Sequence, residues 1–104
     1  AACDITSFDV YPRNQGYPLE QVAIGMENLK GWMPGKPIYC YIETTRYEAA
    51  SAAGPTPNDM EFMVWSAIIH GANGINYFCH ILGQSFSEMG CLQDAAMAAR
   101  LGLV

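Results

Sequence analysis

Strand-like and helix-like segments alternate along this chain, and this alternation constrains the fold more than any other feature. The strand-like segments are DITSFDVYP (4–12), KPIYCYIETT (36–45) and GINYFCHI (74–81). They are rich in β-branched and aromatic residues, which favour strands. We therefore predict the order β-α-β-α-β-α within a single domain that covers residues 1–104.

The second of the three predicted helices, at 56–71, has the clearest boundaries. Thr56 is the expected N-cap, and Pro57 fits the first helical position. Asp59 lies three residues after the cap, where its side chain can return a hydrogen bond to the backbone of Thr56. Gly71 lies just past the expected end, as is common after a helix.

The other two helices are predicted at 18–31 and 91–102, and residues 13–17 are predicted to form a loop. Pro18 is expected at the first position of the earlier helix and Gly31 at its end. The apolar stripe of this helix consists of Leu19, Val22, Ala23, Met26 and Leu29. That spacing predicts a helix with one buried face.

Strands that are separated by single helices pair in parallel through crossover connections. The strand-like segments are largely apolar on both faces, as in a parallel sheet covered by helices, so we expect the strands to be buried on both faces. The chain has three βα units of roughly 35 residues each, whereas a closed barrel has eight units and needs about 250 residues. Only 14% of the residues are charged, against roughly 25% in ordinary domains. We therefore expect a piece of a longer chain or a self-associating one.

Several classes of function are disfavoured by charge and composition. The net charge is −5 and the five cationic residues are scattered, whereas nucleic-acid binding needs clustered Lys and Arg. No apolar segment approaches the ~20 residues that cross a membrane, and no signal-peptide pattern is present in these residues. The four cysteines lack C-x-x-C spacing, so we expect buried free thiols rather than disulfides.

Polar side chains stand at the carboxyl end of each predicted strand. They are Asp9 and Tyr11 on the first, Glu43 with Thr44 and Thr45 on the second, and Asn76 and His80 on the third. Ligands of parallel α/β folds bind at these ends. The competing interpretation is that any strand-to-loop junction is polar. For Glu43 a placed group is favoured, because Tyr39 and Tyr41 share its face by alternation.

Other constellations favour structural roles. Cys79 and His80 are adjacent on a strand and point to opposite faces, so we predict no metal site. The GANG segment precedes a strand rather than a helix, so no phosphate-binding loop and no cofactor are expected. We predict that His70 complements the end of its helix and that Trp32 covers a helix end rather than stacking on a sugar.

The segments quoted above resemble the last part of (β/α)8-barrel glycoside hydrolases. HGANGINYFCH (70–80) is similar to the HGA-x-G-φ-x-YF entry, φ being apolar, into strand eight of the β-galactosidase-like members. DITSFDVYP is similar to their strand six and KPIYCYIE to their strand seven. The resemblance covers nearly the whole chain. It implies the three C-terminal βα units of a TIM barrel, which is a partial barrel.

The resemblance also implies a reaction and its residues. Glu43 matches the nucleophile of a retaining glycosidase, which attacks the anomeric carbon and forms a glycosyl-enzyme. The residues expected to bind the carbohydrate are Asp9, Tyr11, Tyr41, Asn76 and His80. The acid/base glutamate of the family follows strand four, which these residues do not contain. We therefore expect the isolated chain to be inactive, because the acid/base residue is absent.

Two alternatives stay open. The chain could be a non-catalytic module, either a carbohydrate-binding barrel remnant or a barrel fragment that assembles with the remainder of a barrel or with copies of itself. An aldolase or isomerase is disfavoured, because no strand-end lysine, metal cluster or phosphate site is visible. A glycosidase function would favour a secreted or periplasmic location, which the residues themselves do not determine.

Overall fold

Three parallel strands form the centre of the molecule. The computed structural model describes residues 3–104 and, within them, every side chain except that of Gln84. The strands are β1 (Thr6–Asp9), β2 (Ile38–Glu43) and β3 (Gly74–Phe78). They are hydrogen-bonded in the order β1-β2-β3, and both pairs are parallel. The predicted α/β class with a parallel sheet is confirmed.

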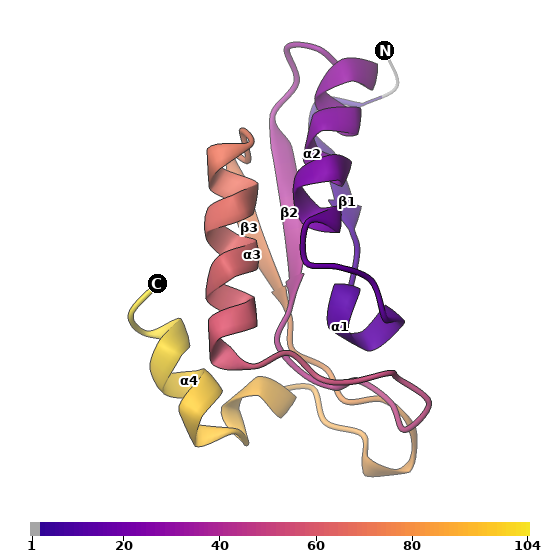
Figure 1. Cartoon of the computed structure of the whole chain (residues 1–104), viewed down its shortest axis with the longest axis vertical. Coiled ribbons are helices and arrows are strands. Elements are labelled where there is room, and N and C mark those ends of the chain that lie inside the picture. Colours follow the sequence, from indigo (N-terminus) through magenta and orange to yellow (C-terminus); the bar gives the residue numbers. More distant parts are fainter. Residues whose placement is uncertain (1–2) are drawn as a thin grey trace.

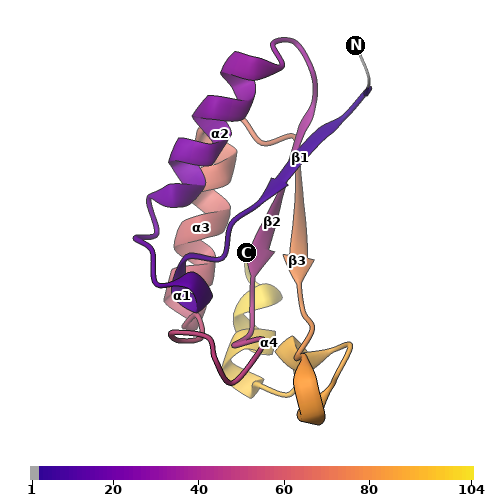
Figure 2. The same ribbon diagram turned by 90° about the vertical axis from the view of Figure 1, so that its right-hand side faces the viewer.

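The two long helices lie on the same face of this sheet. Figures 1 and 2 show α2 (Gln21–Trp32) and α3 (Pro57–Ile69) side by side against it. No helix of the described part of the chain lies across the opposite face (Figure 2), which we call the open face. The expectation that the strands are buried on both faces was wrong. Side chains on β2 alternate between buried and exposed rather than being buried throughout.

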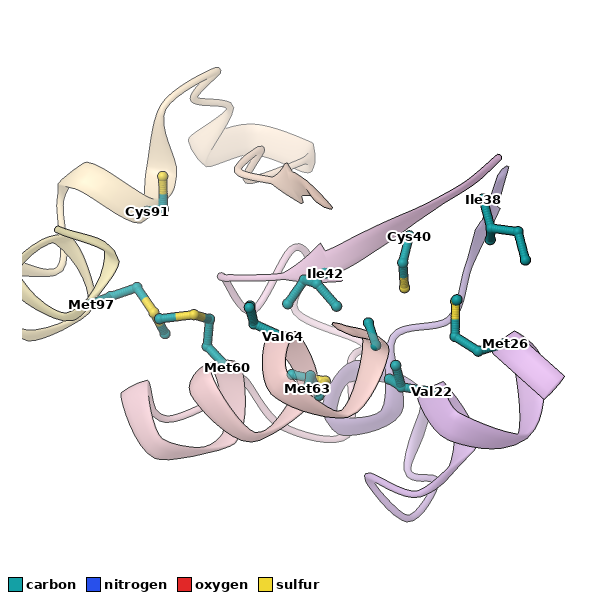
Figure 3. Close-up of a cluster of buried hydrophobic side chains, with 11 residues drawn as sticks. Val22, Met26, Ile38, Cys40, Ile42, Met60, Met63, Val64, Cys91 and Met97 are labelled. Carbon is teal, nitrogen blue, oxygen red and sulfur yellow. The ribbon is translucent and has the colours of Figure 1, made fainter. Parts of the chain in front are cut away.

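The core fills the space between the sheet and the two helices (Figure 3). Its buried members from these elements are Val22, Met26, Ile38, Cys40, Ile42, Met60, Met63, Val64 and Ala67. The predicted stripe is confirmed for Val22 and Met26, which are buried, and for Leu29, which packs against the cluster. Leu19 also packs there, from the turn before α2, and Ala23 is only partly buried. Methionines are numerous here, and their flexible side chains fill irregular gaps. Burial of this stripe is what holds α2 on the sheet.

The boundaries of α2 and its preceding loop differ from the prediction. A short helix, α1 (Pro12–Gln15), replaces the loop predicted at 13–17. Pro18 does not begin α2, because it starts a turn in which its carbonyl accepts a hydrogen bond from the Gln21 N–H at 3.1 Å. Gly31 does not end α2, which continues to Trp32.

The C-terminal region is also less helical than predicted. Two short 3-10 helices, η1 (Gly83–Ser85) and η2 (Gly90–Leu92), precede α4 (Ala95–Leu101). Asp94 caps α4, since its carboxylate accepts hydrogen bonds from the N–H groups of Ala96 and Met97. The helix therefore begins just after the cap, at Ala95, four residues later than predicted. Its Met97 side chain reaches toward Met60 of α3 (Figure 3).

The predicted capping box of α3 is present. Thr56 Oγ1 accepts a hydrogen bond from the Asp59 N–H at 3.1 Å, and Asp59 Oδ2 accepts one from the Thr56 N–H at 3.0 Å. At the other end His70 is the C-cap residue, and Gly71 has a φ of +103°. The His70 ring nitrogen Nδ1 lies 2.8 Å from Glu27 on α2, so this residue also ties the two helices together.

Both tryptophans are exposed, and Trp32 does not have the covering role predicted for it. Trp32, at the end of α2, has an exposed fraction of 74%, and Trp65 on α3 is half exposed. The side chains of α3 that are buried against the sheet include Met60, Met63 and Val64. No helix within residues 3–104 is both long and apolar enough to cross a bilayer. The four cysteines are free thiols.

Candidate functional site

Three of the predicted binding residues form one row across the open face. Asp9 of β1 is the register partner of Tyr41 of β2, and Tyr41 is the register partner of Asn76 of β3. Because side chains alternate along each strand, partners in register point to the same face. Tyr41 has an exposed fraction of 38% and Asp9 is exposed. A carboxylate, a phenol and an amide are therefore presented side by side to solvent.

A hollow of about 340 Å³ lies beside this row. Its lining residues are Ser7, Phe8, Asp9, Tyr11, Tyr41 and Phe78. The volume falls at the lower end of the range for small-molecule sites, roughly 300–1,000 Å³. Aromatic surfaces beside hydrogen-bonding groups suit a ligand that has both apolar faces and hydroxyl groups.

Aromatic rings gather at the carboxyl ends of the strands. The Tyr11 and Phe78 ring centroids are 5.2 Å apart, and the Tyr47 ring lies within 5.8 Å of both. His80 joins the edge of this group at 5.4 Å from Phe78, and Phe86 lies 6.4 Å from His80. The structure thus brings Tyr11 and His80 to the same end of the sheet. Our prediction missed Phe78, although alternation from Asn76 puts it on the open face.

Glu43 stands at the end of β2, as predicted, but its side chain is fully buried. Oε1 accepts a hydrogen bond from the Arg13 N–H at 2.6 Å. Oε2 accepts two, from the Asn14 N–H at 3.1 Å and from Asn14 Nδ2 at 2.7 Å. The two backbone N–H groups belong to the first turn of α1, whose N-cap residue Tyr11 provides no side-chain cap. The Glu43 carboxylate therefore caps α1 from a neighbouring strand, where negative charge is favourable.

Asn14 connects Glu43 to the loop after β2. Its Nδ2 also donates to the carbonyl of Thr45 at 2.7 Å, and its Oδ1 accepts from the Tyr47 N–H at 3.0 Å. The residue has an exposed fraction of only 4%. Sequence analysis missed it because residues 13–17 were assigned to a loop. The turn of α1 that brings it to Glu43 depends on contacts with a segment about thirty residues away.

Thr44 and Thr45 have structural roles. The Thr44 hydroxyl donates to the carbonyl of Phe78 at 2.7 Å, and the Thr45 hydroxyl donates to the carbonyl of His80 at 2.8 Å. Both side chains extend the pairing of β2 with β3 beyond the last residue of each strand. These hydrogen bonds hold the segments just after β2 and β3 side by side, and with them Glu43 and His80.

The titration of the site is dominated by burial. Burial raises the pKa of Glu43 above its usual range, while the hydrogen bonds from Arg13 and Asn14 oppose that rise. Burial and the neighbouring carboxylate of Asp9 raise the pKa of the Tyr11 phenol, and burial raises that of Tyr47. Both phenols therefore stay protonated near neutral pH. They can donate hydrogen bonds and do not act as bases.

Other reactive groups do not join this site. Within the described residues no three His, Cys, Asp or Glu side chains come together as a metal site. Cys40 is buried on the helix side of β2, and burial raises the pKa of its thiol to about 12. A thiol in that state is a poor nucleophile. The groups gathered toward the carboxyl end of the sheet are Glu43, Asp9, Asn76 and the aromatic side chains.

Comparisons of the chain with protein-family models, with curated proteins and with solved structures found no match.

Proposed function

We propose that this chain supplies one wall of the sugar site, and the nucleophile, of a retaining glycoside hydrolase with a (β/α)8-barrel fold. The observation that carries the proposal is the row of Asp9, Tyr41 and Asn76 beside the aromatic hollow at the carboxyl end of a parallel sheet. Glu43 follows Tyr41 by two residues on the same strand. This is where parallel α/β folds bind ligands, and a sugar offers both stacking faces and hydroxyl groups.

The strand order supports a barrel in particular. Strands that follow one another in sequence are also neighbours in the sheet, and α2 and α3 lie on one face (Figure 1). A doubly wound sheet reverses its strand order at a switch point and puts helices on both faces. In a barrel the open face would become the interior. We propose that the remainder of a barrel, or further copies of this chain, covers that face and the two outer strands.

In the proposed reaction Glu43 attacks the anomeric carbon of a bound sugar. A bond forms between the carboxylate oxygen and that carbon as the bond to the leaving group breaks, and water later releases the sugar. Asp9 would accept hydrogen bonds from sugar hydroxyls, and Asn76 could both accept and donate them. Tyr41 would pack against the ring. The acid/base carboxyl group would have to come from outside these residues, about 5–5.5 Å from Glu43.

A second candidate, a non-catalytic carbohydrate-binding module, is favoured by the burial of Glu43. The carboxylate has no exposed surface and already accepts three hydrogen bonds. Attack on a sugar therefore requires neighbouring side chains to move aside. In a binding module Glu43 would only cap α1, and the open face alone would hold the carbohydrate.

Activated fluorosugars separate the two candidates. A 2,4-dinitrophenyl 2-deoxy-2-fluoroglycoside needs no acid catalyst, because dinitrophenolate leaves unassisted, and the fluorine slows hydrolysis of the glycosyl-enzyme. The purified chain would be incubated with the gluco-, galacto- and manno-configured reagents and analysed by intact mass spectrometry. We expect the gain of one fluorosugar, located on Glu43 by peptide mapping, and no turnover of unactivated disaccharides. Glu43→Gln should not be labelled.

Other results of the labelling experiment would contradict one or both of the candidate functions. Labelling at a different residue, or of Glu43→Gln at the wild-type rate, would overturn the assignment of the nucleophile. No labelling, together with sugar-dependent shifts of the Tyr41 and Asn76 NMR signals, would favour the binding module. No labelling and no shift with any of the three sugars would overturn both candidates.

A further inference from the structure

We infer that Asn14 is a positioning residue, which holds Oε2 of Glu43 in place and leaves Oε1 as the oxygen that attacks the sugar. The inference rests on the proposed function of Glu43 as nucleophile. It adds a residue that does not touch the substrate, and it assigns the roles of the two carboxylate oxygens.

The hydrogen bonds divide unequally between the two oxygens. A carboxylate offers about four lone-pair positions, two on each oxygen. Oε2 accepts from both the backbone N–H and the side-chain Nδ2 of Asn14, so its two positions are occupied. Among the residues that the structure describes, Oε1 accepts only from the Arg13 N–H, which leaves one of its positions free. A nucleophile needs a free lone pair, and Oε1 is the oxygen that has one.

The Asn14 side chain is fixed by its other partners. One Nδ2 proton is directed to Glu43 and the other to the Thr45 carbonyl, while Oδ1 accepts from the Tyr47 N–H. A flip of the amide would point Oδ1 at two acceptors and Nδ2 at a donor. The hydrogen-bond network therefore allows one orientation. Burial of Asn14 keeps water from replacing these bonds.

The surroundings of Glu43 define what a change at Asn14 would do. The titratable and charged groups that face Glu43 are Arg13 on α1, Tyr47 in the loop after β2 and Asp59 on α3. Arg13 is the neighbour of position 14 in the chain, but its guanidinium is already paired with Asp59. An added negative charge at position 14 would therefore act mainly on Glu43.

The test is the pH dependence of labelling by the fluorosugar in the wild type, Asn14→Ala and Asn14→Asp. Labelling requires ionised Glu43, and the departing dinitrophenolate carries away the electron pair of the broken bond. We expect Asn14→Ala to label roughly tenfold to a hundredfold more slowly, since small misplacements of a reacting group have effects of that order. The pH midpoint should rise in Asn14→Ala and rise further in Asn14→Asp, where two carboxylates would meet.

Asn73→Ala is the matched control. Asn73 also bonds a backbone group through its side chain, with Oδ1 accepting from the Ile38 N–H at 3.0 Å, but at the far end of β2. It should lose stability without any shift in the pH midpoint. Asn14→Asp keeps the size of the side chain, so it serves if Asn14→Ala does not fold. Thermal unfolding by circular dichroism monitors both variants.

The failure of this inference differs from the failure of the proposed function. Wild-type labelling with an unchanged rate and midpoint in both Asn14 variants would overturn the role of Asn14 and leave Glu43 as nucleophile. An unlabelled wild type would overturn the proposed function, and the attacking role of Oε1 with it. Carboxyl ¹³C NMR, which needs no sugar, then tests the contact alone: an unchanged pKa of Glu43 in Asn14→Asp would exclude it.

Discussion

The guanidinium of Arg13 holds the carboxylate of Asp59 through two hydrogen bonds, of 3.0 and 2.9 Å, although 46 residues separate them in the chain. Asp59 is also the partner of Thr56 in the capping box of α3. The Asp59 carboxylate therefore caps the start of α3 and also ties it to α1, the helix whose first turn Glu43 caps.

We expect Arg13→Lys to lose most of this connection, because an ammonium group cannot form the paired contact of a guanidinium. The loss should be about 0.2–1 kcal/mol in the free energy of unfolding, as for other partly exposed ion pairs. Urea unfolding at neutral pH measures it. In the Asp59→Asn background, Arg13→Lys should lower the free energy of unfolding no further, and an additive loss would contradict a direct pair.

The Arg13 contact also sets an acid dependence. The pKa of Asp59 lies below its usual range, and the hydrogen bonds from Arg13 are the largest cause. A depressed pKa means that the stabilisation is complete above the unfolded-state value of about 3.9 and is lost as the pH falls through the folded-state value. Asp59→Asn should remove this acid-sensitive part of the stability curve.

The contribution of Glu43 to the free energy of unfolding should change with pH in the opposite direction to that of Asp59. Burial raises its pKa in the folded state, so the folded chain binds the proton more tightly than the unfolded chain does. Its contribution should be largest below the unfolded-state pKa of about 4.3 and decline as the pH rises through the folded-state value. Urea unfolding from acid to neutral pH should show this decline, and Glu43→Gln should lack it. The exposed Glu48→Gln is the control, and equal slopes in both variants would contradict the prediction.

Close packing of α2 on β1 predicts a difference between two glycines of the same helix. A Cβ added at Gly25 would overlap the ring of Phe8, whereas one added at Gly31 would meet no atom within 4 Å. Gly25→Ala should destabilise the chain by about 1–3 kcal/mol, as overpacking does. Gly31→Ala should be neutral or stabilising by up to about 1 kcal/mol. Thermal unfolding compares the two, and equal effects would contradict this packing.

The open face predicts that Tyr41 contributes to sugar binding. Tyr41→Leu should raise the fluorosugar concentration needed for half-maximal labelling several-fold, with little change in the maximal rate. Tyr77 has a similar exposed fraction, 36% against 38%, but alternation puts it on the helix side of β3. Tyr77→Leu should therefore leave the concentration dependence unchanged. Equal effects of the two substitutions would count against a sugar site on the open face.

Self-association is expected from the same face. Tyr39 is partly exposed there, and its ring lies against Gly74, where an added Cβ would come within 2.9 Å of it. Light scattering coupled to size exclusion should give a mass above the 11.4 kDa of one chain. Tyr39→Lys should shift the chain toward the monomer, because it buries a charge in the contact. A wild-type monomer at high concentration would contradict the expectation.

The strands, the parallel pairing and the caps of α3 could be predicted because each depends on neighbours in sequence. β-branched and aromatic residues indicate β2, and Thr56 and Asp59, three residues apart, form the capping box of α3. Asp9, Tyr41 and Asn76 were predicted as one site because parallel strands align their carboxyl ends. The row they form, however, depends on a register that only the hydrogen bonds between strands establish.

The sequence by itself therefore determined the order of elements and the end of the sheet where polar and aromatic side chains collect, because alternation and helical spacing are local properties. Only the tertiary structure decided the state of Glu43. Its burial, its three hydrogen bonds and the formation of α1 around it all depend on contacts between segments about thirty residues apart. Pattern cannot reveal such contacts, since a carboxylate at a strand end has the same local sequence whether it meets water or a helix.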